Sequence, residues 1–212
     1  MKYINNPKEI EDKSFEIITR ELGGKIFPNG TDSIIKRVIH TTADFEYGEI
    51  TEISPEFIET FQKLILEGSD IYCDTEMIKS GLNKSALSNL NTSVYTLIND
   101  EKVKKEAQEF GITRSIAGVK KALQRENTKI FVIGNAPTAL FTICETVTNE
   151  KVKNIAVVGV PVGFVGAAES KEELKKTNIP YIVTNGRKGG STVAVSIVNA
   201  LLYQLTKRHE NN

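Results

Sequence analysis

Short β-branched runs that alternate with helical segments are the feature of this sequence that most restricts its fold. Three runs are clearest, at residues 129–133, 154–159 and 181–184, and each precedes a glycine-containing turn and a helical pattern. Strands separated by helices form βαβ units, whose right-handed crossovers place helices on both faces of a parallel sheet. The chain is therefore predicted to be α/β: one domain, residues 1–212, with a mostly parallel sheet between two helical layers, as in Rossmann-like folds.

The rest of the pattern adds further elements to this core. Strands are also predicted at residues 70–73 and 93–98. His40 ends the second predicted helix. Residues 1–6 and 206–212 are predicted to be frayed tails. Helices are predicted to begin at Asn6-Pro7 and Ser54-Pro55, at or near Asp32, Thr75, Asp100 and Thr113, and finally at Ser191, from which the last helix runs to about Leu205.

Composition excludes several classes of protein. Lys plus Arg and Asp plus Glu both number 27, so no net charge attracts nucleic acid or an anionic membrane. The longest apolar stretch, residues 155–168, is too short and too rich in Gly and Pro to span a bilayer, and residues 1–14 lack the apolar core of a signal peptide. Cys73 and Cys144 lie far apart in apolar sequence, which predicts buried, reduced thiols and a cytoplasmic protein.

His40 is one of two histidines and lies among polar groups in the run of residues 37–47, whereas His209 falls in the predicted tail. An imidazole has an ordinary pKa of about 6.5, so it can donate or accept a proton near neutral pH. A histidine at the end of a helix can equally stabilise the negative end of the helix dipole. The residue alone leaves both roles open.

Four loops are predicted to meet at the carboxyl edge of the sheet, where open parallel sheets bind ligands. They span residues 74–77, 134–138, 159–166 and 185–191. The last combines glycines, a helix start, Arg187 and Lys188, which suits carboxylates or phosphates, although an ordinary strand-to-helix turn can carry the same residues. The glycines of residues 159–166 lack the spacing of a dinucleotide fingerprint, and the sequence contains no nucleoside-triphosphate P-loop motif.

Four segments carry a family resemblance, at residues 37–47, 134–141, 159–170 and 186–191. Together, and in this order, they resemble the precorrin-8X / cobalt-precorrin-8 methylmutase family of cobalamin biosynthesis, over about residues 8–202. The resemblance implies an isomerase that moves a methyl group between adjacent carbons of corrin ring C to give (cobalt-)hydrogenobyrinate. It also implies an α/β homodimer with sites near the subunit interface and no redox or methyl-donor cofactor.

The resemblance assigns His40 as the catalytic residue, which protonates or hydrogen-bonds the ring C region. An intramolecular methyl shift has no leaving group and no external nucleophile, so one positioned acid and a surface that recognises the carboxylate-fringed macrocycle are sufficient. Asp44 or Asp74 is expected to hydrogen-bond His40 or the ring, with helix capping as the competing interpretation. Arg37 and Thr41 or Thr42 are expected to orient His40, and no residue is expected to bind a metal. The residues expected at the substrate are Ser14, Arg37, Thr41, Thr42, Asp74, Arg114, Asn135, Gly163, Arg187, Lys188, Gly189, Gly190 and Ser191.

Two alternatives stay open. A non-catalytic corrinoid carrier would use the same loops and the same dimer, but it needs no titrating group, so a requirement for His40 separates the two. A nucleotide-binding enzyme would use residues 186–191 and would be stabilised by nucleotide. The sequence also leaves open whether the substrate already holds cobalt and which surfaces form the dimer, with the helix from Ser191 and the segment near His40 as candidates.

Overall fold

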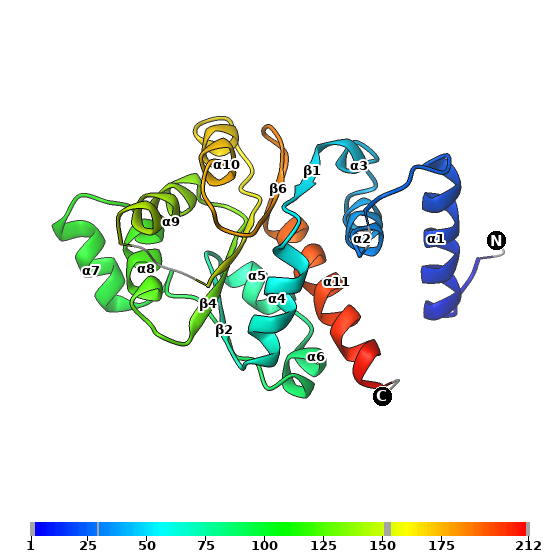
Figure 1. The fold of residues 1–212 in the computed structure, drawn as a ribbon, viewed down its shortest axis with the longest axis horizontal. Helices are drawn as coiled ribbons and strands as arrows, with labels where there is room; N and C mark the ends of the chain where they lie inside the picture. Colours follow the sequence, from blue (N-terminus) through cyan, green and yellow to red (C-terminus); the bar gives the residue numbers. More distant parts are fainter. Residues whose placement is uncertain (1–2, 29, 151–153, 211–212) are drawn as a thin grey trace.

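A mixed sheet forms the centre of the molecule in a computed structural model that describes residues 3–28, 30–150 and 154–210 (Figure 1). The order of its six strands is β1-β6-β5-β4-β2-β3, and every neighbouring pair is parallel except β1 and β6. The predicted fold class, a single-domain α/β fold with a mostly parallel sheet, is confirmed. The strands are β1 (Thr51–Ile53), β2 (Asp70–Cys73), β3 (Val94–Tyr95), β4 (Thr128–Ile133), β5 (Ala156–Gly159) and β6 (Tyr181–Thr184).

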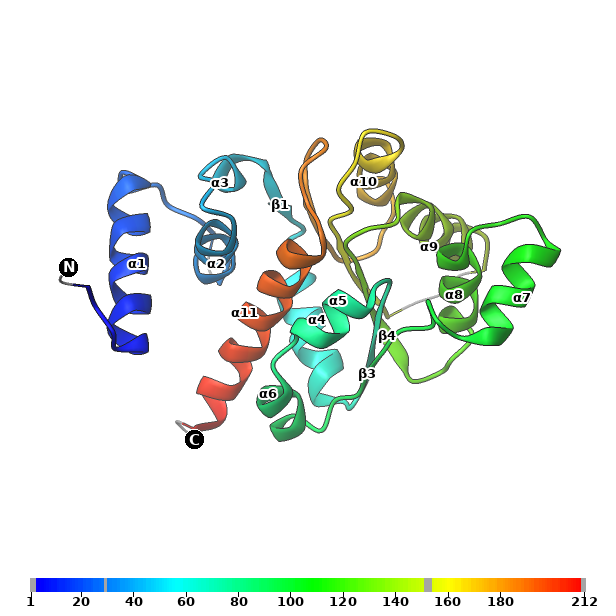
Figure 2. The same ribbon diagram turned by 180° about the vertical axis from the view of Figure 1, so that it is seen from behind.

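Helices cover both faces of this sheet, as Figures 1 and 2 show with α7 to α10 on one side and α4 and α11 on the other. Side chains of a strand alternate between the two layers. Ile130 and Val132 of β4 pack with α2, α4, α5, α6 and α11, whereas Phe131 and Ile133 pack with α7 to α10. The helices are α1 (Pro7–Glu21), α2 (Asp32–Thr42), α3 (Tyr47–Ile50), α4 (Phe57–Leu66), α5 (Glu76–Gly81), α6 (Lys84–Asn89), α7 (Glu101–Glu109), α8 (Arg114–Leu123), α9 (Pro137–Glu150), α10 (Ala167–Lys175) and α11 (Ser191–Glu210).

The antiparallel edge strand β1 is absent from the sequence prediction. Its pairing with β6 continues beyond its last residue, because Ser54 N–H donates to the carbonyl of Tyr181 and Ser54 Oγ accepts from Tyr181 N–H. Ser54 therefore extends the strand pairing and does not cap a helix. The prediction of a helix start at Ser54-Pro55 is wrong by two to three residues, since α4 begins at Phe57.

Other boundaries differ for local reasons. β3 covers only two residues of the predicted 93–98, because Thr96 Oγ1 accepts from Ile98 N–H and turns the chain towards α7. Asp32 is the first residue of α2 and pairs with Lys36 at 2.9 Å, so the helix-cap position falls to Thr31. The predicted tail 206–212 is wrong for residues 206–210, which continue α11, while residues 1–2 and 211–212 lie outside the described part. The short helices α3 and α6 are also missing from the prediction.

Cys73 and Cys144 are both free and buried, as the sequence predicts. Burial raises the pKa of the Cys144 thiol to about 12, so this thiol is protonated at neutral pH. Across the described residues, no helix combines the length and the apolar character that crossing a membrane requires.

Candidate active site

The loops predicted to meet at the carboxyl edge of the sheet are joined by direct hydrogen bonds. The hydroxyl oxygens of Thr75, after β2, and Ser191, at the start of α11, lie 3.0 Å apart. Gly163 N–H donates to the carbonyl of Arg187 at 3.1 Å, and Gly190 N–H donates to the carbonyl of Val160 at 2.9 Å. The predicted convergence of these loops is confirmed.

Asp74 fixes the turn that precedes α9. Its side chain is buried, and its carboxylate accepts hydrogen bonds from the N–H groups of Gly134, Asn135 and Ala136 at 3.0, 2.9 and 2.8 Å. Burial raises the pKa of this carboxyl group, and the three donors counteract part of that effect. Both oxygens thus cap the backbone ahead of α9. The described contacts of Asp74 are those of the competing interpretation, a cap contributed from a distant strand. Its expected contact with the substrate stays a prediction.

Glycines let these loops touch one another. Gly189 has a φ of +156°, and a Cβ atom there would lie 2.2 Å from the carbonyl oxygen of Val160. A Cβ atom on Gly134 would lie 3.0 Å from the Cα atom of Ser191. Any side chain at Gly189 would push the β5 and β6 loops apart. The loop of residues 186–191 is therefore held in one shape by its neighbours.

Lys188 forms ion pairs with residues that follow α2. Its Nζ atom donates to the carboxylates of Asp44 and Glu46. The bond to Asp44, with support from Glu46, raises the pKa of Lys188, and the bond from Lys188 lowers the pKa of Asp44. Asp44 thus pairs with Lys188, and the expectation that it bonds His40 is corrected. This contact joins the segment after α2 to the loop before α11.

Arg187 presents its charge outward beside an exposed aromatic ring. Its guanidinium carbon lies 5.4 Å from the ring centroid of Phe164, which is 83 % exposed, and Val165 beside it is 89 % exposed. Large apolar side chains at the tip of a loop are unusual on a surface and mark contact sites. Sequence reasoning missed Phe164 and Val165, although two apolar residues between Gly163 and Gly166 are a signal for them.

His40 lies exposed in the last turn of α2. Its ring centroid is 5.3 Å from that of Phe15 in α1. Arg37, one turn earlier, also stacks on Phe15, with its guanidinium carbon 5.3 Å from the ring, and pairs with Glu11 at 3.0 Å. Phe15, which sequence reasoning missed, thus contacts both Arg37 and His40, which lie one turn apart on α2.

The three predicted hydroxyl groups of α1 and α2 bond to their own helices. Thr41 Oγ1 donates to the carbonyl of Arg37 at 2.9 Å, and Thr42 Oγ1 donates to that of Val38 at 2.9 Å. Ser14 Oγ donates to the carbonyl of Ile10 at 2.8 Å. Each hydroxyl oxygen keeps acceptor capacity after donating its one proton. None of these three hydroxyls is hydrogen-bonded to His40 in the described structure.

A shallow cavity of about 230 Å³ lies beside α2. It is smaller than the roughly 300–1,000 Å³ typical of small-molecule sites, so it holds only part of a large ligand. Arg37 and Thr41 line it from α2, together with Met77 and Gly81 of α5 and Thr192, Val195, Ser196, Asn199 and Tyr203 of α11.

Arg114 does not line this cavity. It begins α8, and its Nη1 atom lies 3.3 Å from the carbonyl oxygen of Ile98, on the β3 side of the sheet. The neighbouring Thr113 hydroxyl is 3.2 Å from that of Thr138 in α9. The described contacts therefore connect Arg114 to the α8–α9 layer, whereas His40 belongs to the α2 layer.

Comparison with known proteins identifies the family. The family model "CbiC: Precorrin-8X methylmutase" matches residues 9–204. The chain belongs to the precorrin-8X methylmutase family. It is 45 % identical to the cobalt-precorrin-8 methylmutase of Leptospira interrogans, over 99 % of this chain and 100 % of that protein, and 46 % identical to that of Salmonella typhimurium, over 97 % and 99 %. The solved precorrin-8x methyl mutase of Thermus thermophilus is 35 % identical, with a TM-score of 0.85 over 94 % of this chain and 98 % of that one.

The protein is thus a methylmutase, an enzyme of the isomerase class. Methylmutase activity decides against the non-catalytic carrier, and none of the relatives named above is described as a nucleotide-binding enzyme. Within this methylmutase, His40 and Arg187 are both exposed, and the ion pair of Lys188 with Asp44 joins the loop of Arg187 to the segment that follows the helix of His40.

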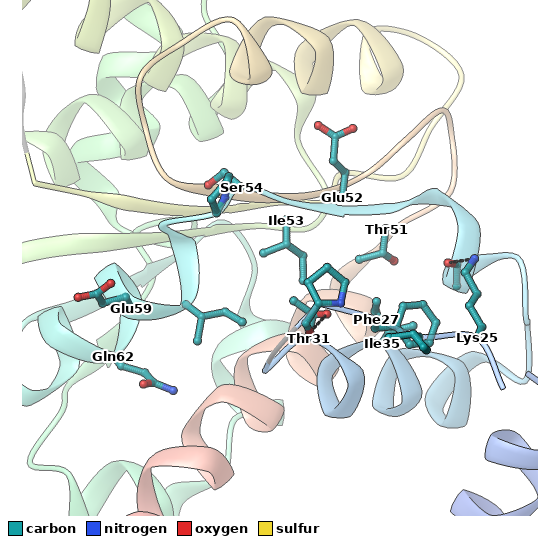
Figure 3. A pocket seen from close by; sticks show the side chains of 15 residues that line it. Lys25, Phe27, Thr31, Ile35, Thr51, Glu52, Ile53, Ser54, Glu59 and Gln62 are labelled. Carbon is teal, nitrogen blue, oxygen red and sulfur yellow. Dashed lines mark hydrogen bonds between the residues drawn. The ribbon is translucent and has the colours of Figure 1, made fainter.

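The methylmutase also has a cleft of about 660 Å³ away from these residues (Figure 3). It runs between β1, α4 and the segment before α2, with Lys25 and Glu59 at opposite ends. None of the predicted site residues lines it. The expected site and this cleft are thus two separate places on the molecule.

Proposed function

We propose that this methylmutase shifts a methyl group between adjacent carbons of corrin ring C and that His40 is the proton donor. The observation that supports this role is the exposed imidazole at the end of α2, a helix that also lines the 230 Å³ cavity through Arg37 and Thr41. Phe15 packs against the ring from α1, with the two ring planes at 46°. An exposed, oriented imidazole can meet a macrocycle that docks from solvent.

The chemistry requires little else from the protein. A methyl group that migrates within one molecule needs no external acceptor, and protonation of the ring C region polarises the conjugated system from which it migrates. General acid catalysis contributes about 100- to 10,000-fold. The remaining acceleration comes from holding the macrocycle in a reactive geometry.

The proposed binding surface for the macrocycle's carboxylates is the group of loops at the carboxyl edge. Arg187 supplies an outward cation, and Asn135 is exposed on the neighbouring loop. Gly163, Gly189, Gly190 and Ser191 shape that surface through their backbone, while Lys188 is partly neutralised by its carboxylate partners. Arg114 contributes from the α8 side.

Replacing His40 tests the proposed role. His40→Ala should reduce turnover by about 100-fold or more, since it removes the acid. His40→Asn keeps an N–H donor without a titrating proton, so an equally large loss would assign proton transfer and not hydrogen bonding alone. The conversion of the methylated precursor is followed by absorption, and binding of hydrogenobyrinate provides the control for folding. Undiminished formation of the rearranged product by His40→Ala would remove His40 from the mechanism.

We further propose that the substrate is cobalt-precorrin-8. Two relatives at 45 % and 46 % identity carry that name, while the Thermus protein named for precorrin-8x is at 35 %. Turnover of cobalt-loaded and metal-free substrate by the same preparation compares the two directly. Faster turnover of the metal-free form would contradict the proposal.

The proposed assembly is a cytoplasmic homodimer with sites near the interface. The small cavity beside α2 and the exposed Met77, Phe164 and Val165 support a site that a second surface completes. The peripheral α1, which lies against α2 at one end of the molecule in Figures 1 and 2, offers further surface, with Ile10 44 % exposed. Sedimentation at micromolar concentration should give twice the chain mass.

A further inference from the structure

Lys171 is the most buried charged side chain that the proposed mechanism leaves unused. It lies on α10 with no solvent exposure, although a lysine is almost never fully buried without a partner for its charge. Its Nζ atom donates to the carbonyl oxygens of Gly186 and Lys188 at 2.9 and 2.7 Å and lies 3.3 Å from Thr184 Oγ1. All three of its N–H donors therefore point at β6 and the loop that follows it.

A second buried side chain hydrogen-bonds to the same loop. Thr184, also without solvent exposure, donates its hydroxyl proton to the carbonyl of Lys188 at 2.7 Å. Lys188 is thus held at its main chain by two buried groups and at its side chain by Asp44 and Glu46. The carbonyl of Arg187 is in turn held by Gly163 N–H.

These contacts determine which way the carbonyl groups of the loop point. Three successive carbonyls, those of Gly186, Arg187 and Lys188, are occupied by donors from within the protein. A trans peptide points its C=O and its N–H in opposite directions, so the N–H groups of Arg187 and Lys188 face away from the donors that hold the preceding carbonyls, which is an arrangement that favours anions. Arg187, which is exposed, follows this pattern.

We propose that Lys171 is a positioning residue of the methylmutase, whose buried ammonium group holds the loop of residues 186–191 in the shape that receives substrate carboxylates. The inference rests on the proposed function of that loop. Burial lowers the pKa of Lys171 to about 8, so the group still carries its three donors at neutral pH. A methionine of similar length fills the same space but leaves the carbonyl of Gly186 without its donor.

The test compares Lys171→Met with Lys176→Met in the full-length protein. Lys176 is the residue that ends the same helix, its side chain is 68 % exposed and it pairs with nearby Glu173, so it controls for the loss of a lysine from this segment. Hydrogen–deuterium exchange of the peptide that contains residues 186–191 reports the loop itself, and a titration with hydrogenobyrinate reports binding. Lys171→Met should speed exchange and weaken binding by about tenfold or more, because opening of the loop no longer breaks these bonds. Its kcat at saturating substrate should stay within about threefold, since the acid on α2 is untouched.

A role confined to stability predicts a different result. Lys171→Met would then lower the melting temperature, while the exchange rate of the loop and the dissociation constant for hydrogenobyrinate stayed within about twofold of the values for Lys176→Met. This outcome would overturn the proposal. Should Lys171→Met fail to fold, Thr184→Val removes the shared hydroxyl at nearly constant volume, and unchanged exchange and affinity in that variant would overturn it equally. Arg187→Met separates the two proposals: unchanged affinity there rejects carboxylate binding by the loop, whereas the exchange data judge Lys171 independently.

Discussion

Lys188 donates a hydrogen bond to the carboxylate of Asp44, which ties the loop before α11 to the segment that follows the helix of His40. Glu46 accepts a second bond from the same ammonium group, so two carboxylates share one cation. The pairing changes how the two adjacent cations of this loop are interpreted. Among the described residues no carboxylate pairs with Arg187, whereas Lys188 would have to leave Asp44 and Glu46 before it could bind another anion.

Arg187 should therefore matter more for binding than Lys188. Arg187→Met is expected to weaken hydrogenobyrinate binding by about tenfold or more, because a charge-assisted bond to a ligand carboxylate is lost. Lys188→Met should cost less than about threefold, because the ammonium group of Lys188 is already paired with Asp44 and Glu46. Absorption titrations of both variants at one ionic strength make the comparison. Equal losses would show that Lys188 exchanges Asp44 for the ligand.

Asp74 should be required for stability, although it was expected at the substrate. Asp74→Asn replaces one acceptor oxygen with an NH₂ group that faces backbone donors at the start of α9. The unfolding free energy should fall by about 2–3 kcal/mol, because a buried N–H group loses its acceptor. Denaturant unfolding at pH 7 measures the change.

Asp100→Asn is the matched control for that substitution. Asp100 caps α7 through the N–H groups of Lys102 and Val103, but at an exposed site. Asn and Asp cap exposed helices about equally well, so this variant should unfold like the wild type. A similar loss in both variants would mean that burial of Asp74 is not the cause.

The sequence predicts the central part of the fold because that part is encoded locally. The runs that become β4, β5 and β6 are apolar on both faces, and a parallel sheet brings their following loops to one edge whatever the details of the loops. His40 is likewise predictable at the end of α2, since the apolar stripe of that helix precedes it. The missed edge strand β1 has only three residues, which adopt strand geometry by pairing with β6.

Long-range polar contacts could not be predicted in the same way. Asp74 and Ala136 are 62 residues apart, and Asp44 and Lys188 are 144 residues apart, so nothing near either residue signals its partner. Lys171 lies in the segment Glu169-Ser-Lys-Glu-Glu173, whose charges indicate an exposed helix. Burial of one lysine from that segment depends on β6 and its loop, which tertiary packing brings to it.

Gly189 should tolerate no side chain. Gly189→Ala places a methyl group against the carbonyl of Val160 at a backbone angle that L-residues rarely adopt. The expected cost is about 3 kcal/mol or more, from overpacking and strain together. Gly186→Ala, in the same loop with a φ of +76° and no atom within 4 Å of the added Cβ, carries only the strain, about 1–2 kcal/mol. Thermal unfolding of Gly189→Ala and Gly186→Ala measures the two losses of stability. Equal losses would contradict this account.

The buried ammonium group of Lys171 also predicts how stability depends on pH. Its pKa is lowered by burial from 10.5 to about 8 in the folded protein. Between these values the unfolded chain binds more protons than the folded one, so this group makes the unfolding free energy rise with pH. The groups that face its Nζ atom are a hydroxyl and two carbonyls, none of which titrates in this range.

Other groups titrate in alkali as well, so the measured quantity is the difference in unfolding free energy between wild type and Lys171→Met. That difference should grow in favour of the wild type by about 2 kcal/mol between pH 8 and pH 10. The corresponding difference for Lys176→Met should not grow in this way, because Glu173 raises the pKa of that exposed lysine. A Lys171→Met difference that is constant with pH would mean that Lys171 keeps an ordinary pKa and that its burial does not disfavour the charged form.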